Sequence, residues 1–487
     1  MGLRKIKNIL IILITALLLS AVSLAIMGNV GKKENDNSSA ASAIYSIYNF
    51  NDLKQFRQSM IDGNNYDNQV VNLYADIDMS AGTWDFEYNG SPFCGIFNGN
   101  NHCLYNFTGS RPIFFRIFEG VVQDLSLYAN NSSAGLIYHV SDSAKVINCS
   151  VFGNIKFQGN KNTARYAGIA YYCSGGKIIN CQNYANIDGG ESSRVGGIVG
   201  ETENGPSGSR IICCINYGSI KGSSEIGGIV GRLEDSAVSQ TSQILNCINL
   251  GKISGNEYIG GITGRNYHNS AQIYRCYNSQ NSGVKGAGVG GSKVGKDFTD
   301  GDFYCSTTSD LNTAAGVRRY ASDSSKWDTN KEWESDNTWF CDSSNSYWSN
   351  ISSSSNLNEG YPYIKSSALT VTVNVNNSSY GNTGSFQIIR SDSISASGSS
   401  IRVNSSYNVY SASPKSSTNQ YTYSFSSWSG IPSGAQYANF SITANFTRAV
   451  RQYTVYINVD SSTNYGTVSA SRVYNVPYGS RITYGKD

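Results

Sequence analysis

A repeated segment of about 33 residues constrains the fold of this chain more than any other feature of its sequence. One position of the repeat is cysteine, and successive cysteines are 32, 33, 33 and 29 residues apart, at Cys149, Cys181, Cys214, Cys247 and Cys276. A glycine-rich tract follows in each unit, as in residues 196–200 and 227–231, which both read GGIVG. A third apolar position lies between the two, for example Ile187 or Ile220. Each unit therefore predicts three short β segments separated by turns.

Such a unit is too small to bury its apolar side chains alone. Stacked units place like residues over like and close a continuous core. We therefore predict an all-β chain whose main part is a right-handed parallel β-helix (solenoid), with isoleucines in its interior. Asparagines two positions after the cysteine are expected to form a ladder at one corner, in which each amide bonds the amides above and below; they are Asn183, Asn216, Asn249 and Asn278.

The chain has 11 cysteines, and five of them occupy that single repeat position. Stacked side chains point the same way, with a separation somewhat beyond that of a disulfide, so we interpret them as buried, reduced thiols that act as small hydrophobic groups. Zinc sites need converging CxxC pairs, and none occurs. We expect no metal and no cofactor.

The composition agrees with β-structure and excludes one class of partner. Charged residues make up 15% of the chain and aromatic residues 12%, with 34 tyrosines. The 37 basic and 34 acidic residues leave a formal charge of +3. This balance gives no basic footprint for nucleic acid, so we expect no nucleic-acid partner.

The N-terminus has the pattern of an export signal. Arg4, Lys5 and Lys7 precede an apolar run from Ile9 to Met27, as in a secretory signal peptide. Because the run approaches the length that spans a bilayer, residues 1–27 are either a signal peptide or a signal-anchor helix that attaches the protein to the membrane. Residues 28–49 are small and polar and predict a linker. We expect the mature chain to be extracellular or on the cell surface.

One short helix is expected after the linker. Asn51 is the predicted cap, Leu53, Phe56 and Met60 follow at helical spacing, and Gly63 ends the helix. We expect no other helix in the mature protein.

The repeats resemble the GLUG-motif β-solenoid of bacterial surface proteins, and the GGIVG tracts carry the match. Residues 73–80 (LYADIDMS), Trp84 and residues 92–102 (PFCGIFNGNNH) resemble the opening coil of these proteins, and residues 360–364 (GYPYI) resemble their closing strand. The resemblance implies a solenoid over residues 50–365. It implies little about activity, since the family is mostly described as adhesin-like or of unknown function.

A second module begins near Leu369, where Leu369, Val371, Val373 and Val375 alternate with polar residues as in a half-buried strand. Residues 425–430 (FSSWSG) and 440–446 (FSITANF) resemble the divergent B-repeat of internalin-type surface proteins. We predict a B-repeat-like module over residues 366–450 and a partial second one over residues 451–487.

The sequence gives no catalytic constellation. No HExxH, GxSxG or P-loop motif occurs, and the coil carboxylates, among them Glu201 and Glu225, do not recur at one repeat position. Asp297, Asp300 and Asp302 form the best acidic group, which we interpret as a solvated loop. We predict no catalytic residue and no enzymatic activity.

Tyrosines carry the remaining functional signal, because aromatic side chains stack on sugars and anchor protein interfaces. The candidate ligand-binding residues recur around the coils; they are Tyr172, Tyr184, Tyr217, Tyr258 and Tyr267. The alternative is that tyrosine serves here only as a common β-former on a surface of low charge.

These features together predict an exported, adhesin-like bacterial surface protein. A monomer is expected, which binds a glycan or a host or extracellular-matrix protein through a face of the solenoid. Two alternatives remain: a β-helix enzyme that degrades polysaccharide, and a structural envelope protein without a specific ligand.

Overall fold

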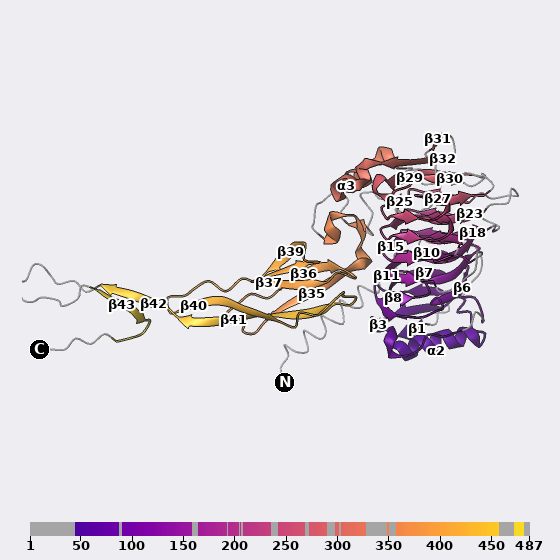
Figure 1. The fold of residues 1–487 in the computed structure, drawn as a ribbon. Coiled ribbons are helices and arrows are strands. Elements are labelled where there is room, and N and C mark those ends of the chain that lie inside the picture. The colour runs from indigo at the N-terminus through magenta and orange to yellow at the C-terminus, as the bar shows by residue number, and fades with distance from the viewer. Residues whose placement is uncertain are drawn as a thin grey trace, which may run out of the picture. The chain divides into compact units, whose positions relative to one another are not determined.

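The computed structural model describes residues 44–86, 90–157, 164–191, 193–203, 205, 208–234, 242–267, 272–289, 298–300, 303–327, 348–349, 357–456 and 472–481. The described residues between 44 and 308 form a parallel β-solenoid, which confirms the predicted fold class. Figure 1 shows its coils stacked from the indigo helix α2 to the orange strands β31 and β32. No helix in the described part of the chain is long and apolar enough to cross a membrane, and the apolar run 9–27 lies outside that part.

Three sheets build the described part of the solenoid. The long sheet holds 21 strands: β1 (Ile44–Ile47), β2 (Val70–Leu73), β3 (Ile77–Asp78), β4 (Ile96–Asn98), β5 (Cys103–Phe107), β7 (Val121–Gln123), β8 (Ser126–Ser132), β10 (Lys145–Ile147), β11 (Ser150–Lys156), β14 (Lys177–Ile179), β15 (Gln182–Asn183), β16 (Asn186–Asp188), β19 (Arg210–Ile212), β20 (Ile215–Asn216), β21 (Ile220–Lys221), β24 (Gln243–Leu245), β25 (Ile248–Asn249), β26 (Ile253–Ser254), β29 (Gln272–Ser279), β31 (Phe298–Asp300) and β32 (Phe303–Thr308).

The other two sheets carry the glycine-rich tracts. The seven-stranded sheet holds β6 (Phe114–Phe118), β9 (Ile137–Ser141), β13 (Ala170–Ser174), β18 (Val199–Glu203), β23 (Val230–Leu233), β28 (Thr263–Asn266) and β30 (Ala287–Val289). The four-stranded sheet holds β12 (Tyr166–Ala167), β17 (Ser193–Gly196), β22 (Ser224–Gly227) and β27 (Glu257–Gly260).

Residues at the same repeat position lie over one another, as predicted. Ile178 pairs with Ile211 and Ile211 with Ile244, and these side chains are fully buried. Ten described cysteines carry free thiols, and nine of them are buried. Burial raises the pKa of the Cys181 thiol well above its ordinary value, as expected for a neutral thiol in an apolar interior.

The asparagine ladder is present at the predicted corner. Asn183 Nδ2 donates to Asn216 Oδ1 at 2.8 Å, Asn216 Nδ2 to Asn249 Oδ1 at 2.7 Å, and Asn249 Nδ2 to Asn278 Oδ1 at 2.8 Å. Asn183, Asn216 and Asn249 each also donate to the carbonyl two residues ahead, as Asn216 does to Gly218 O at 2.9 Å. The four side chains are fully buried, so the ladder satisfies polar groups that would otherwise lack partners.

Two helices correct the sequence-based expectation. Helix α2 (Phe50–Ile61) begins at Asn49, whose side chain accepts from Asp52 N, and not at Asn51, because Phe50 and Asn51 are already helical. A second helix, α3 (Ala314–Ser322), was not predicted. Thr313 caps it, and its apolar side packs on a second core cluster that includes Tyr277 and Trp327.

Residues 368–450 fold as two small sheets. Strands β35 (Ala368–Val375), β36 (Gly384–Ile389), β40 (Tyr421–Ser429) and β41 (Phe440–Val450) form one, and β37 (Ile394–Ser397), β38 (Ser400–Val403) and β39 (Tyr407–Ser411) the other. The predicted alternation is confirmed, since Leu369, Val371 and Val373 are buried between exposed residues. Two short antiparallel pairs complete the strands: β33 (Trp348–Ser349) with β34 (Tyr363–Ile364), and β42 (Gln452–Tyr456) with β43 (Arg472–Pro477).

Candidate functional site

Two columns of side chains run along the solenoid at the boundary of the seven-stranded and four-stranded sheets. The first column occupies one register position of the seven-stranded sheet, where Tyr172, Glu201, Arg232 and Arg265 lie over one another. The second follows the four-stranded sheet, where Arg194, Glu225 and Tyr258 share one register position and Arg165 stands directly before β12 in the same order. The two columns are called here the inner and the outer column of the site.

The columns face each other because the chain reverses at the glycine tract between them. Each outer-column residue precedes its inner-column neighbour by seven positions, as Arg194 precedes Glu201. Arg194, Glu225 and Tyr258 adopt positive φ angles of 65°, 55° and 52°. This left-handed conformation marks the turn-like backbone of the outer column.

Two glycines show why the tracts are needed. A Cβ atom at Gly231 would lie 2.6 Å from Gly200 O and 2.7 Å from the Arg194 carbonyl carbon, so the close approach of the two columns requires glycine there. A Cβ at Gly197 would lie 2.6 Å from Asn216 Oδ1, so this glycine makes room for the asparagine ladder on the opposite side. The glycine tract therefore has two roles: it lets the two columns approach each other, and it leaves room for the asparagine ladder.

The side chains of the two columns are complementary in every coil. Arg165 Cζ lies 4.0 Å from the centre of the Tyr172 ring, and Arg194 Nη1 donates to Glu201 Oε2 at 3.0 Å. In the next two coils the roles are exchanged: Arg232 Nη1 lies 3.7 Å from Glu225 Oε2, and Arg265 Cζ lies 4.4 Å from the centre of the Tyr258 ring.

Contacts between coils join these pairs into one network. Glu201 Oε2 also accepts from Arg165 Nε, and Glu201 Oε1 lies 3.5 Å from Arg232 Nε. Glu225 accepts from Arg194 Nε at 3.3 Å and from Arg265 Nη1 at 2.9 Å. Each of the two carboxyl groups thus lies against three guanidinium groups.

Glu201 is fully buried beneath these arginines. Burial raises the pKa of its carboxyl to about 9; its hydrogen bond with Glu234 acts in the same direction, and Arg232 opposes the rise. His139 lies two coils before Glu201 in the same register column, and its Nε2 is 2.7 Å from Ser174 Oγ. Burial and the positive charge of Arg116 lower its pKa to about 4, so this imidazole is neutral at physiological pH.

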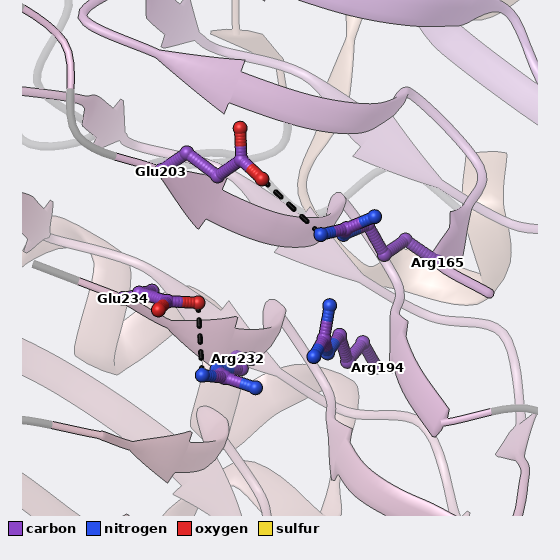
Figure 2. Close-up of a pocket in the computed structure, with 5 residues that line it drawn as sticks. All are labelled: Arg165, Arg194, Glu203, Arg232 and Glu234. Atoms are coloured by element: carbon purple, nitrogen blue, oxygen red, sulfur yellow. Dashed lines mark hydrogen bonds and ion pairs between the residues drawn. The ribbon is translucent and has the colours of Figure 1, made fainter. Parts of the chain in front are cut away.

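A groove of about 440 Å³ opens over the network, lined by Arg165, Arg194, Glu203, Arg232 and Glu234. Figure 2 shows Glu203 and Glu234 on neighbouring strands, each directed toward an arginine, with Arg194 beside them. Arg165 Nη2 lies 3.2 Å from Glu203 Oε1, and Arg232 Nη2 lies 2.9 Å from Glu234 Oε2. The groove can therefore offer guanidinium donors to a ligand.

Three of the five predicted tyrosines belong to this site. Tyr172 and Tyr258 stack on Arg165 and Arg265, and the ring of Tyr267, which is 38% exposed, lies 4.1 Å from Arg232 Cζ and 4.5 Å from Arg265 Cζ.

The other two, Tyr184 and Tyr217, lie elsewhere. Their rings stack on each other at 4.6 Å, and the Tyr217 hydroxyl donates to Pro362 O in the predicted closing strand. The structure therefore brings together three candidates and separates two.

Sequence analysis missed the charged residues of the site. A carboxylate that recurs at one repeat position would have indicated a site. No such recurrence exists, because glutamate, arginine and tyrosine replace one another in the columns. The available signal was the complementary pair seven residues apart across each glycine tract, from Arg165 and Tyr172 to Tyr258 and Arg265. Of the acidic group near residue 300, Asp297, Asp302 and the side chain of Asp300 lie outside the described residues.

Across the described ranges, no group of three or more histidine, cysteine or acidic side chains could hold a metal ion. No protein-family model and no curated protein matches the chain.

Two solved structures resemble it. One, from Bacteroides ovatus, is provisionally named an immunoglobulin A1 protease; it is 19% identical, with a TM-score of 0.47, over 69% of this chain and 95% of its own. The other is named IgA1 protease; it is 14% identical, with a TM-score of 0.38, over 56% of this chain and 22% of its own.

Both names contradict the prediction that the chain has no enzymatic activity, and that prediction is withdrawn. The absence of a familiar catalytic motif was too weak a ground for it, because catalytic groups are recognised by their geometry and not by sequence order. At these identities and TM-scores the likeness itself concerns the fold. The GLUG motif and the B-repeat stay predictions.

Proposed function

We propose that this chain is an exported, adhesin-like protein of the bacterial surface that binds its ligand in the groove between the two columns. The observation that carries the proposal is the convergence of four arginines, four glutamates and three tyrosines on one side of the coil stack. A buried network of this kind costs desolvation energy that apolar packing would not, so its presence favours a role in recognition.

The groove suits a polar ligand with ring-shaped or planar parts. Guanidinium groups give directed hydrogen bonds to oxygen acceptors, and the Tyr267 ring supplies an exposed aromatic surface beside them. A glycan or a host or extracellular-matrix protein fits these requirements. Export would follow from the N-terminal apolar segment, and the B-repeat-like residues 366–487 would hold the solenoid away from the cell.

Hydrolysis of the bound ligand is a second candidate, favoured by the carboxyl groups of the groove. The Glu201 carboxyl, whose pKa burial raises to about 9, holds a proton at neutral pH, whereas Glu203 and Glu234 reach the solvent. Carboxyl groups in such different environments are the usual partners of acid–base catalysis.

The test is a binding screen of the full chain on glycan and extracellular-matrix arrays, with two tyrosine variants. Tyr267→Ala should weaken binding to any captured ligand about tenfold, because it removes the exposed aromatic ring that lies on Arg232 beside the groove. Tyr456→Ala is the matched control, since Tyr456 is 65% exposed on β42, outside the solenoid.

Equal binding by the two variants, or no binding by the wild-type chain, contradicts the proposal. Each captured ligand, and immunoglobulin A1 as the substrate that the names of the similar structures suggest, is then incubated with the chain. Released reducing ends or peptide fragments would establish an enzyme.

A further inference from the structure

The carboxyl groups of the site fall into two classes by exposure. The side chains of Glu201 and Glu225 are 0% and 7% exposed, and each lies against three arginines. The side chains of Glu203 and Glu234 are 39% and 29% exposed. The first pair belongs to the interior of the network and the second pair to the wall of the groove.

The interior carboxyls fix the arginines in place. The Arg194 and Arg232 side chains are only 16% and 10% exposed, and both contact Glu201 and Glu225 together. Because the interior carboxyls already fix these guanidinium groups, the arginine side chains lose little conformational freedom when they bind a ligand. Two interior carboxyls, of which Glu201 holds a proton at neutral pH, face four guanidinium groups, which leaves positive charge directed at the groove.

Glu203 and Glu234 add negative charge at the groove surface. Arg165 and Arg232 each use Nη2 for these contacts, at 3.2 and 2.9 Å. Partly exposed ion pairs of this kind are weak because water screens them and long side chains are free to move. A ligand anion can therefore take their places at little cost.

We infer that the groove binds an acidic polysaccharide, whose carboxylate or sulfate groups replace Glu203 and Glu234 on Arg165 and Arg232. This inference rests on the proposed function and names its ligand class. No covalent step is involved: the two glutamate side chains swing toward solvent as the ligand anions form bidentate or single hydrogen bonds with the guanidinium groups.

Two features favour a polysaccharide over an acidic peptide. Glu203 and Glu234 follow the paired residues Thr202 and Leu233 of neighbouring strands, so the two anion positions are spaced at roughly the 4.8 Å distance between strands, as charges are spaced regularly along a polymer of acidic sugars. Tyr267 lies on both Arg232 and Arg265, which places an exposed ring beside the anion-binding nitrogens. Sugar rings pack on such aromatic faces while their acidic groups pair with arginine.

The experiment is isothermal titration calorimetry on the full chain with four probes of similar length: heparin oligosaccharide, oligogalacturonate, neutral maltooligosaccharide and poly-L-glutamate. The variants are Glu203→Gln, Glu234→Gln and the double variant, each of which removes an internal competitor without changing the side-chain shape. Asp67→Asn is the control, since Asp67 is an exposed acid near helix α2, far along the solenoid from the groove. Thermal melting checks that every variant is folded.

At least one acidic oligosaccharide should bind ten times more tightly than the neutral one, and raising the salt concentration should weaken it. Glu203→Gln and Glu234→Gln should each raise its affinity about threefold and the double variant about tenfold, as expected for the loss of weak competing ion pairs. Asp67→Asn should leave it unchanged.

Tighter or equal binding of the neutral probe or of poly-L-glutamate overturns the inference, and so does a loss of affinity in the glutamine variants. A neutral glycan that binds with the Tyr267 dependence described above would overturn the ligand class while leaving the proposed function intact. No binding by any probe, together with an empty array, would overturn both.

Discussion

Replacing Asn216 by alanine removes the middle of the asparagine ladder and tests how far the ladder stabilises the coils that carry the site. The variant loses three hydrogen bonds of 2.7–2.9 Å, two to neighbouring asparagines and one to Gly218 O. Each is worth about 1 kcal/mol net, and Asn249 Oδ1, left buried without this donor, adds about 1–2 kcal/mol. We therefore expect Asn216→Ala to lower the free energy of unfolding by about 4 kcal/mol.

Asn186→Ala is the matched control. Asn186 is also an asparagine that bonds across coils, to Asn154 at 3.3 Å and to Ser219, but its side chain is exposed. Because water replaces its partners, its loss should cost less than about 1 kcal/mol. Urea unfolding measures the difference, and hydrogen exchange of the Gly197 and Gly228 amides localises it. Equal destabilisation by the two variants would refute the reasoning.

Three further results are expected. Gly231→Ala should lower the melting temperature and abolish ligand binding, because its Cβ would meet Gly200 O at 2.6 Å and separate the columns; a variant that melts like wild type would contradict this. Burial and Arg116 lower the pKa of His139 to about 4, so stability should be complete above pH 6.5 and fall toward pH 4, and His139→Gln should reduce that acid dependence in melting curves. Burial raises the pKa of Glu201 from 4.5 to about 9, so wild-type stability should fall as pH rises across this interval, and Glu201→Gln should flatten the profile.

The sequence predicted those parts of the fold that repeat. Isoleucine, cysteine and asparagine each recur at one position in successive coils, since stacked core positions and the ladder favour the same residue type in each coil. The second helix was missed because Ala314–Ser322 lies beyond the repeats and its apolar residues bury against a cluster that includes Tyr277, which is distant in sequence. The cap of α2 was displaced by two residues, within the usual uncertainty of helix ends.

The site was predicted only through its tyrosines because its residues do not repeat by identity. What repeats is the relation between two positions: Arg165 with Tyr172, Arg194 with Glu201, Glu225 with Arg232, and Tyr258 with Arg265, always seven residues apart. A search for one residue type along the coils misses a pattern in which arginine faces either glutamate or tyrosine across a turn.

The residues that stack in the core and the residues of the two columns obey different constraints. The glycine tract fixes the approach of the two columns through its backbone, as Gly231 shows, and its demands do not depend on which side chains stand at the column positions. A coil can therefore exchange Glu201 and Arg194 for Arg232 and Glu225 without altering the stack beneath. The order of charges along the columns is then limited by the ion pairs between coils, such as those of Glu201 with Arg165 and Arg232, and not by the backbone of the fold.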